Sequence, residues 1–152
     1  MIDHLSLPVS DVEATTRAYA AALKPIGYAV VMAFTRAQIP QLPFSQTTGL
    51  GAKGKPDLWL RPARHAVDGT HVALRVEHRK DVDAFHEAAI AAGLRDDGGP
   101  GVREHYHPHY YAAFVRDADG HSLEVVCHAA PPKPAKKKKT APKKKPATKK
   151  RR

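Results

Sequence analysis

Residues 71–76 of the chain read HVALRV and residues 4–9 read HLSLPV, so the pattern His-x-x-Leu-x-Val occurs twice, 67 residues apart. Both stretches alternate apolar and other side chains with a period of two, which is typical of a strand with one buried face. An Ala-rich segment with a polar start follows each of them, at residues 11–23 and 80–92. The recurrence predicts two similar halves, although two similar strand starts can also arise by chance.

The remaining segments complete the same order of elements in each half. Ser10 and Asp11 supply an N-cap for the first helix, and Gly93 ends the second. The sequence DADG at residues 117–120 predicts a tight turn, because Gly tolerates positive φ. Further strands are predicted at residues 28–34, 47–52, 57–61, 94–96, 110–116 and 122–128. The predicted order is strand–helix–strand–strand–strand, present twice, which makes an α+β domain.

Charge is distributed unevenly along the chain. The 152 residues include 25 Lys or Arg and 15 Asp or Glu, a formal net charge of +10. Residues 131–152 contain twelve of the basic residues and no acidic one, which leaves 13 basic and 15 acidic residues in residues 1–130. We therefore predict one folded domain, residues 1–130, that is not a basic nucleic-acid-binding fold, and a disordered Lys/Pro/Ala-rich cationic tail, residues 131–152.

The tail admits more than one interpretation. Its basic residues can hold nucleic acid nonspecifically, because phosphate contacts release counterions. It contains no aromatic residue that could stack on bases. A solubilising segment without a defined partner is the alternative, and anionic membrane surfaces or polyphosphate are further candidate partners.

Cysteine content and the first residues bear on the cellular compartment. Cys127 is the single cysteine, which excludes an intramolecular disulfide and fits a reducing compartment. The opening MIDHLSLPVSD lacks the basic start and apolar run of a signal peptide. No stretch approaches the roughly 18 apolar residues that span a bilayer. We expect a soluble, cytoplasmic protein.

Three potential metal ligands share one face of the predicted sheet. His4, His71 and Glu124 each lie opposite the apolar side chains of their own strand. A carboxylate within an apolar strand is unfavourable unless it is paired or coordinated. Two imidazoles and one carboxylate are a common ligand set for Fe, Mn, Zn or Ni, with positions left open for substrate or water. Taken singly, either histidine is more often a hydrogen-bonded strand residue than a ligand, and Glu124 alone could be a solvated strand residue.

The segment HYHPHYY, residues 105–111, concentrates histidines and tyrosines. As the wall of a site it would offer His105, His107 or Tyr111 as a proton carrier or hydrogen-bond donor to substrate. The alternative is a surface loop whose tyrosines pack on the sheet. Arg75 lies on the face of the predicted metal ligands and could meet an anionic substrate, although a solvated strand end explains it at least as well.

Several of these stretches resemble one known superfamily. HLSLPVSDVEATTRAY (residues 4–19), the repeat HVALRV and FVRDADGHSLEVVCH (residues 114–128) are similar to the vicinal oxygen chelate superfamily, which includes glyoxalases, bleomycin resistance proteins and dioxygenases. The resemblance covers roughly residues 1–130, and its most specific part is the motif Asp-x-Asp-Gly-x-x-x-Glu that ends at Glu124. It implies two βαβββ modules forming a curved, cup-shaped mixed sheet with helices on the outer face.

The resemblance also implies a metal in the cup and places His4, His71 and Glu124 at ligand positions. Lactoylglutathione lyase has a further carboxylate on the fourth strand of its first module, whereas this chain reads DLWLRP there, with Trp59 among leucines. Asp57 stands only at the start of that strand. The remaining ligand set is more similar to that of the dioxygenases, although this chain is much shorter than the two-domain ring-cleaving enzymes.

The expected function is therefore a metal-dependent enzyme acting on a small oxygenated substrate, by lyase or isomerase chemistry or as a dioxygenase. The competing class is a non-enzymatic, bleomycin-resistance-like module that only binds a small ligand. A third class is a nucleic-acid-associated protein that acts through its tail. Because superfamily members with one pair of modules often dimerise, the resemblance also implies a homodimer.

Overall fold

The computed structural model describes residues 2–64 and 69–131 and divides them into two modules of the same element order. The first module consists of β1 (Leu5–Val9), α1 (Val12–Leu23), the 3-10 turn η1 (Lys24–Ile26), β2 (Tyr28–Thr35), β3 (Gln46–Ala52) and β4 (Lys55–Pro62). The second module consists of β5 (His71–Val76), α2 (Arg79–Ala91), β6 (Arg95–Val102), β7 (Tyr111–Arg116) and β8 (Ser122–Cys127). The predicted pair of βαβββ modules is confirmed.

Each module forms its own four-stranded mixed sheet, in the orders β1-β4-β3-β2 and β5-β8-β7-β6. The first strand of each module is parallel to its fourth, and the other neighbours are antiparallel. Leu5 pairs with Leu58 in the first sheet, and Val72 pairs with Leu123 in the second. Leu5 and Val72 are both the second residue of the repeated pattern. The first strand therefore pairs with a leucine of the fourth strand at the same point in both sheets.

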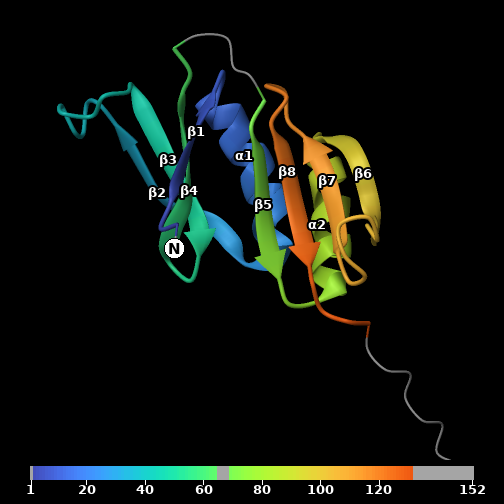
Figure 1. Cartoon of the computed structure of the whole chain (residues 1–152). Coiled ribbons are helices and arrows are strands. Elements are labelled where there is room, and N and C mark those ends of the chain that lie inside the picture. The colour runs from blue at the N-terminus through green and yellow to red at the C-terminus, as the bar shows by residue number, and fades with distance from the viewer. Residues whose placement is uncertain (1, 65–68, 132–152) are drawn as a thin grey trace, which may run out of the picture.

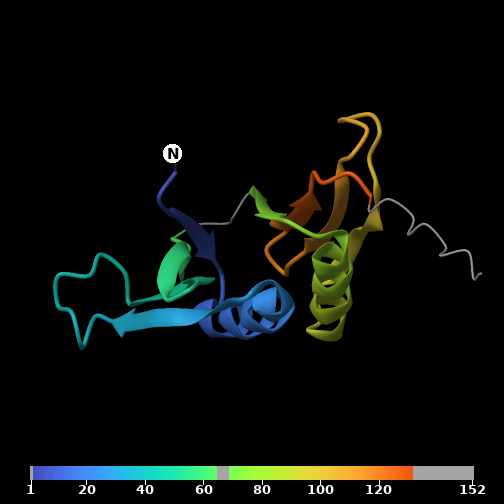
Figure 2. The ribbon, with the colours of Figure 1, turned by 90° about the horizontal axis from the view of Figure 1, so that it is seen from below.

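Helices α1 and α2 lie side by side on the same side of the two sheets (Figures 1 and 2). Helix α1 begins where expected, since Asp11 is its N-cap and the Asp11 side chain accepts a hydrogen bond from the Ala14 N–H at 2.9 Å. The short η1 extension ends at Gly27, whose φ of 85° lies in the left-handed region. Within the described residues, neither helix is long and apolar enough to cross a membrane.

The core lies between the sheets and the helices. The predicted alternation holds on β1, where Leu7 and Val9 are 1% and 0% exposed and face the helices. Tyr19 of α1 and Phe85 of α2 are fully buried there. Burial of one such side chain stabilises the fold by about 1.5–3 kcal/mol. The opposite faces of the sheets are therefore left for polar side chains.

The turn between β7 and β8 ties the second module to the first. Its Asp117 is buried and accepts a hydrogen bond from the Tyr19 hydroxyl at 2.8 Å, across 98 residues of sequence. Its Asp119 accepts a hydrogen bond from the Ser10 N–H at 2.8 Å. The most specific part of the family motif thus has a structural task, which is to join the modules.

Candidate metal centre

A histidine–carboxylate pair lies on the face of the second sheet that is turned away from the helices. His71 is the first residue of β5, and its Nε2 lies 2.9 Å from Oε2 of Glu124 in the middle of β8. The Glu124 side chain is 3% exposed, whereas the His71 side chain is 52% exposed. The pair therefore joins a buried carboxylate to an imidazole that solutes can reach.

Tyr110 completes the surroundings of this carboxylate. Its hydroxyl donates a hydrogen bond of 2.6 Å to Oε1 of Glu124. Burial, and then this hydrogen bond, raise the pKa of Tyr110 above its ordinary value, so the phenol keeps its proton and remains a donor. Sequence reasoning missed Tyr110, although parity would have found it, because Phe114 lies on the same face and pairs with Glu124.

A cavity of about 560 Å³ opens beside the pair. Its walls include His71, Phe114, Arg116 and Ser122 from the sheet, and Asp97, Gly98, Arg103, His105 and Tyr106 from β6 and the segment before β7. The volume is within the range of small-molecule sites. A small ligand in this cavity would lie directly against the imidazole of His71.

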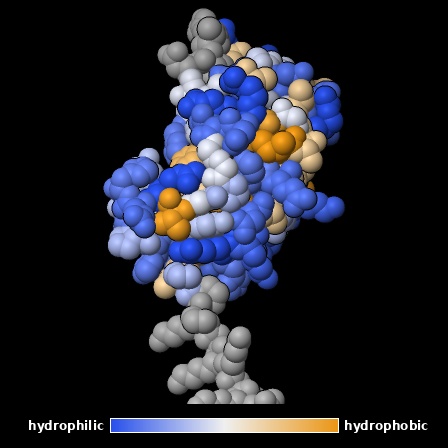
Figure 3. Space-filling model, turned by 90° about the vertical axis from the view of Figure 1, so that its right-hand side faces the viewer, coloured by the Kyte–Doolittle hydropathy of each residue, from blue (hydrophilic) through white to orange (hydrophobic). Residues whose placement is uncertain are grey.

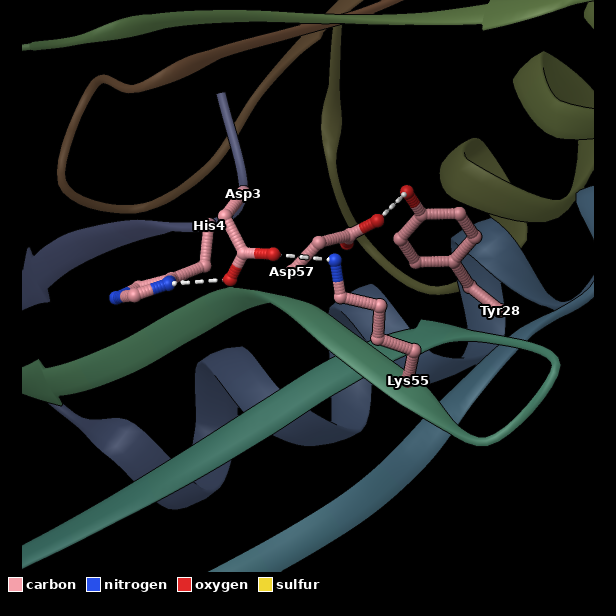
Figure 4. Close-up of polar contacts among 5 residues, drawn as sticks. All are labelled: Asp3, His4, Tyr28, Lys55 and Asp57. Carbon is pink, nitrogen blue, oxygen red and sulfur yellow. Dashed lines mark hydrogen bonds and ion pairs between the residues drawn. The ribbon is translucent and has the colours of Figure 1, made fainter. Parts of the chain in front are cut away.

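His4 has different surroundings (Figure 4). Its Nδ1 lies 3.0 Å from Oδ1 of Asp3, and Lys55 contacts the other oxygen of that carboxylate. The hydrogen bond from Lys55, followed by that from His4, lowers the pKa of Asp3. Nearby, the Tyr28 hydroxyl donates to Asp57 at 3.0 Å.

A second cavity, of about 300 Å³, is lined by His4 and its neighbours together with residues 72–74 of β5. Among the described residues, no hydrogen bond or ion pair joins His4 to His71 or Glu124. The structure thus brings two of the three predicted metal ligands into contact and places the third beside a separate cavity.

The three predicted proton carriers also differ in position. His105 lines the larger cavity. His107 has its Nε2 2.6 Å from Nδ1 of His128 and stacks on that ring. Tyr111 points to the helix side, where its hydroxyl donates to Asp83 of α2 at 2.7 Å. Of the three, His105 has the position best suited to contact a ligand.

Asp117, Asp119 and His121 also hold ligand-type atoms within 4.8 Å of one another. Both ring nitrogens of His121 are already engaged, since Nε2 donates to the Pro8 carbonyl at 2.9 Å and Nδ1 accepts from the Thr70 N–H at 3.0 Å. The carboxylates likewise accept the inter-module hydrogen bonds described above. An ion would have to break these bonds, so this cluster fits a structural network better than a metal site.

The family model of the Glyoxalase/Bleomycin resistance protein/Dioxygenase superfamily matches residues 1–125. The chain belongs to this superfamily. A glyoxalase/bleomycin resistance protein from Albidiferax ferrireducens is 21% identical with a TM-score of 0.60, and the match covers 82% of this chain and 95% of that one. No curated protein sequence matches this superfamily member.

Two further solved structures show the same fold. A glyoxalase/bleomycin resistance protein/dioxygenase domain from a Frankia species is 20% identical with a TM-score of 0.64, covering 84% of this chain and 96% of that chain. A variant of the fosfomycin resistance protein FosX from Listeria monocytogenes, complexed with Mn(II) and 1S,2S-dihydroxypropylphosphonic acid, is 16% identical with a TM-score of 0.59. That match covers 83% of this chain and 88% of FosX.

The donors of the second module fit the divalent metal that the superfamily implies. An imidazole nitrogen and a carboxylate oxygen converge at 2.9 Å beside a cavity, and both are ordinary ligands of such ions. Without an ion, the Nε2–H of His71 compensates the buried charge of Glu124 by donating to it. Two protein ligands leave room for a third and for substrate.

Proposed function

We propose that this superfamily member is a metal-dependent enzyme of the glyoxalase/dioxygenase type that acts on a small oxygenated substrate. The observation that carries the proposal is the contact between His71 and Glu124 beside the larger cavity. We assign the metal to His71, Glu124 and His4. A divalent ion held there, Fe, Mn, Zn or Ni, would supply Lewis-acid activation of a substrate oxygen. The Mn(II) and the small diol phosphonate in the FosX structure support this choice of ion and ligand.

We propose further that His4 of the partner subunit completes the metal site in a homodimer. Within one chain, β1 and β5 run in opposite directions (Figure 1), so His4, just before β1, and His71, at the start of β5, do not begin their strands at the same end. His4 is also held by Asp3 beside a separate cavity. A second copy is therefore the simplest source of a third ligand for His71 and Glu124.

The chain's own residues would prepare the site in two ways. Tyr110 holds Oε1 of Glu124 and leaves Oε2 facing His71, which fixes the orientation of the carboxylate. His105 lines the cavity, and an imidazole side chain can act there as general acid or base. In this proposal His105 moves the proton, and His107 and Tyr111 support the segment that carries it.

Metal analysis of the full chain tests the proposal. Purified protein reloaded with each ion in turn should retain about one ion per chain, and His71→Ala or Glu124→Gln should abolish that retention. The matched control is His86→Ala, because His86 also contacts a carboxylate, Asp96, at 2.9 Å but lies outside the cavity. Metal retention by both site variants, or its loss in the control, would contradict the assignment.

The alternative is the non-enzymatic binding module. It is favoured by the separation of His4 from the other two ligands, since a cavity that only binds needs no complete metal site. The two functions are separated by chelation and metal add-back. A metal-free chain that binds its ligand as tightly as the reloaded chain, without turnover in either form, would establish the binding module instead.

A second proposed activity concerns the tail, of which residues 132–152 lie outside the described residues. With twelve basic residues and no acidic one in residues 131–152, we propose that it tethers the domain to nucleic acid through phosphate contacts. Deletion of these residues should abolish retention on immobilised DNA at low salt and leave unfolding of the domain unchanged. Equal retention by the truncated chain would refute the tether.

A further inference from the structure

Arg103 carries a positive charge that is not compensated at the wall of the larger cavity. It follows β6 and lines the cavity together with His71. Its Nη2 donates to the Gly99 carbonyl at 2.7 Å, and its guanidinium lies 5.5 Å from the centre of the Phe114 ring. No carboxylate of the described residues forms an ion pair with it. An arginine placed in this way retains donors for an external anion.

Glycines of β6 make the space in which this guanidinium rests. A Cβ on Gly101 would lie 2.7 Å from Nη1 of Arg103, and a Cβ on Gly98 would lie 3.3 Å from its Nη2. The Gly98 N–H is in turn held by Asp96 at 3.0 Å. A larger residue at either glycine would push the guanidinium away, so the strand backbone itself determines the position of the charge.

A second arginine at the cavity wall, Arg116, has its charge compensated, unlike Arg103. Arg116 also lines the cavity, but its Nε forms an ion pair of 3.0 Å with Asp97, and its Nη1 donates to the Gly120 carbonyl. Its charge is therefore largely satisfied within the protein. Figure 3, which views the molecule from the β6 side, shows a mostly hydrophilic surface with small separate hydrophobic patches. The cavity wall around Arg103 includes His105, Arg116 and Ser122, so it suits a polar ligand.

We infer that the cavity takes a substrate with an oxyanion group, a carboxylate or a phosphate-type group, and that Arg103 anchors this group. This inference rests on the proposed function, because the rest of the same substrate must reach His71. Arginine presents paired N–H donors that match both kinds of oxyanion. Arg103 would thereby select anionic oxygenated compounds over neutral ones of the same size.

The test is an NMR titration of the full chain after chelator treatment, at about 0.15 M ionic strength to screen the charge of the tail. The probes are oxalate for the carboxylate class, inorganic phosphate for the phosphate class, and ethylene glycol as a neutral comparison. At least one anion should shift the amide signals of Gly98 and Gly101, and ethylene glycol should not. The anion that binds more tightly identifies the class.

Two variants test the anchor separately from the overall charge. Arg103→Met should weaken binding of the anion at least about tenfold, as expected for loss of charge-assisted hydrogen bonds. Gly101→Ala keeps the charge but displaces the guanidinium, and should weaken binding several-fold. The matched controls are Arg95→Met, which removes an exposed arginine at the start of β6, and Gly99→Ala, where a Cβ would meet nothing closer than 3.9 Å.

Unchanged binding in Arg103→Met, or equal losses in Arg103→Met and Arg95→Met, would overturn the inference. Metal content is measured on separate, untreated samples of the same variants and should not change, because Arg103 is not a proposed metal ligand. A failure of the anion site therefore leaves the metal assignment standing. Conversely, if the chain never retains metal but binds oxalate or phosphate through Arg103, the result would contradict the proposed function and leave the anion site standing.

Discussion

The two modules hold different side chains at equivalent positions beside their first strands. In the first module, Trp59 occupies the position that Glu124 has in the second, since Ser6 pairs with Trp59 and Ala73 pairs with Glu124. Trp59 packs over β3, where a Cβ on Gly49 would lie 3.1 Å from its ring. One backbone architecture thus supports an apolar contact in one half and a buried carboxylate in the other, so the fold alone does not determine the chemistry.

The turns before the last strands differ as well. In the first module, β3 and β4 are joined by Lys53 and Gly54, both with positive φ, in a short hairpin. In the second module, the turn at residues 117–121 carries Asp117 and Asp119, which bind the first module. The second module therefore contains the contact between His71 and Glu124 and also the carboxylates that hold the modules together, whereas the first contributes mainly packing.

The largest effect on stability is expected from Asp117→Ala. Asp117 accepts hydrogen bonds from the Tyr19 hydroxyl and from the backbone N–H groups of Asp119 and His121. Their loss inside the protein should lower the free energy of unfolding by about 3 kcal/mol or more, measured by urea denaturation. Asp117→Asn keeps one carbonyl acceptor and should recover part of this loss. A change below about 1 kcal/mol would mean that the turn does not join the modules.

Tyr110→Phe tests how the second module orients its carboxylate. Without the hydroxyl, Oε1 of Glu124 loses its donor, and metal affinity should fall about 10- to 100-fold, measured by competition with a chelating dye. The neighbouring Tyr111→Phe removes a hydroxyl that binds Asp83 on the helix side, so it should leave metal affinity unchanged. Equal losses of metal affinity in the two variants would show that Tyr110 does not orient Glu124.

The sequence predicts the strands with alternating side chains better than it predicts the glycine-rich strand β6. Alternation on β1, β5 and β8 predicts their faces correctly, because a buried face requires apolar residues at every second position. The sequence predicts a strand only at residues 94–96, whereas β6 extends over Arg95–Val102, through the glycines and proline of RDDGGPGV. That strand pairs through its backbone with β7 and has two register shifts, so its side chains carry little periodic signal.

For the site, parity alone is enough to place His71 and Glu124 on one face, and the structure has them in contact. Their role as metal ligands stays a prediction. Parity cannot place His4 relative to them, since that depends on how the modules are arranged in space. Parity does separate Tyr110, which shares the face of Phe114 and Glu124, from Tyr111, which faces the helices. It does not show that the Tyr110 hydroxyl reaches the carboxylate, because Tyr110 precedes β7.

Tyr19→Phe tests the link between the modules with a smaller change. Its hydroxyl is buried against Asp117, so the variant should lower the free energy of unfolding by about 1–2 kcal/mol. This loss should exceed that of Tyr28→Phe, because the half-buried Tyr28 hydroxyl binds Asp57 within the first module. Burial, and then Asp117, raise the pKa of Tyr19. The difference in the free energy of unfolding between wild type and Tyr19→Phe should be largest below pH about 10. It should decline above that pH, because Tyr19 ionises in the unfolded chain before it does in the folded one. A difference that grows above that pH would contradict this assignment.

The smallest effect is expected in the hairpin of the first module, with the opposite sign. Lys53 has a φ of 53°, which is unfavourable for most L-residues, and Gly54 follows with a φ of 76°. Lys53→Asn creates the Asn-Gly pair that such turns prefer and should raise the free energy of unfolding by about 0.5–1 kcal/mol in chemical denaturation. Lys53→Ala, which lacks that preference, should not. If Asn destabilised the chain instead, Lys53 would have to contribute a contact outside the turn, and the first module could no longer be regarded as the half that contributes mainly packing.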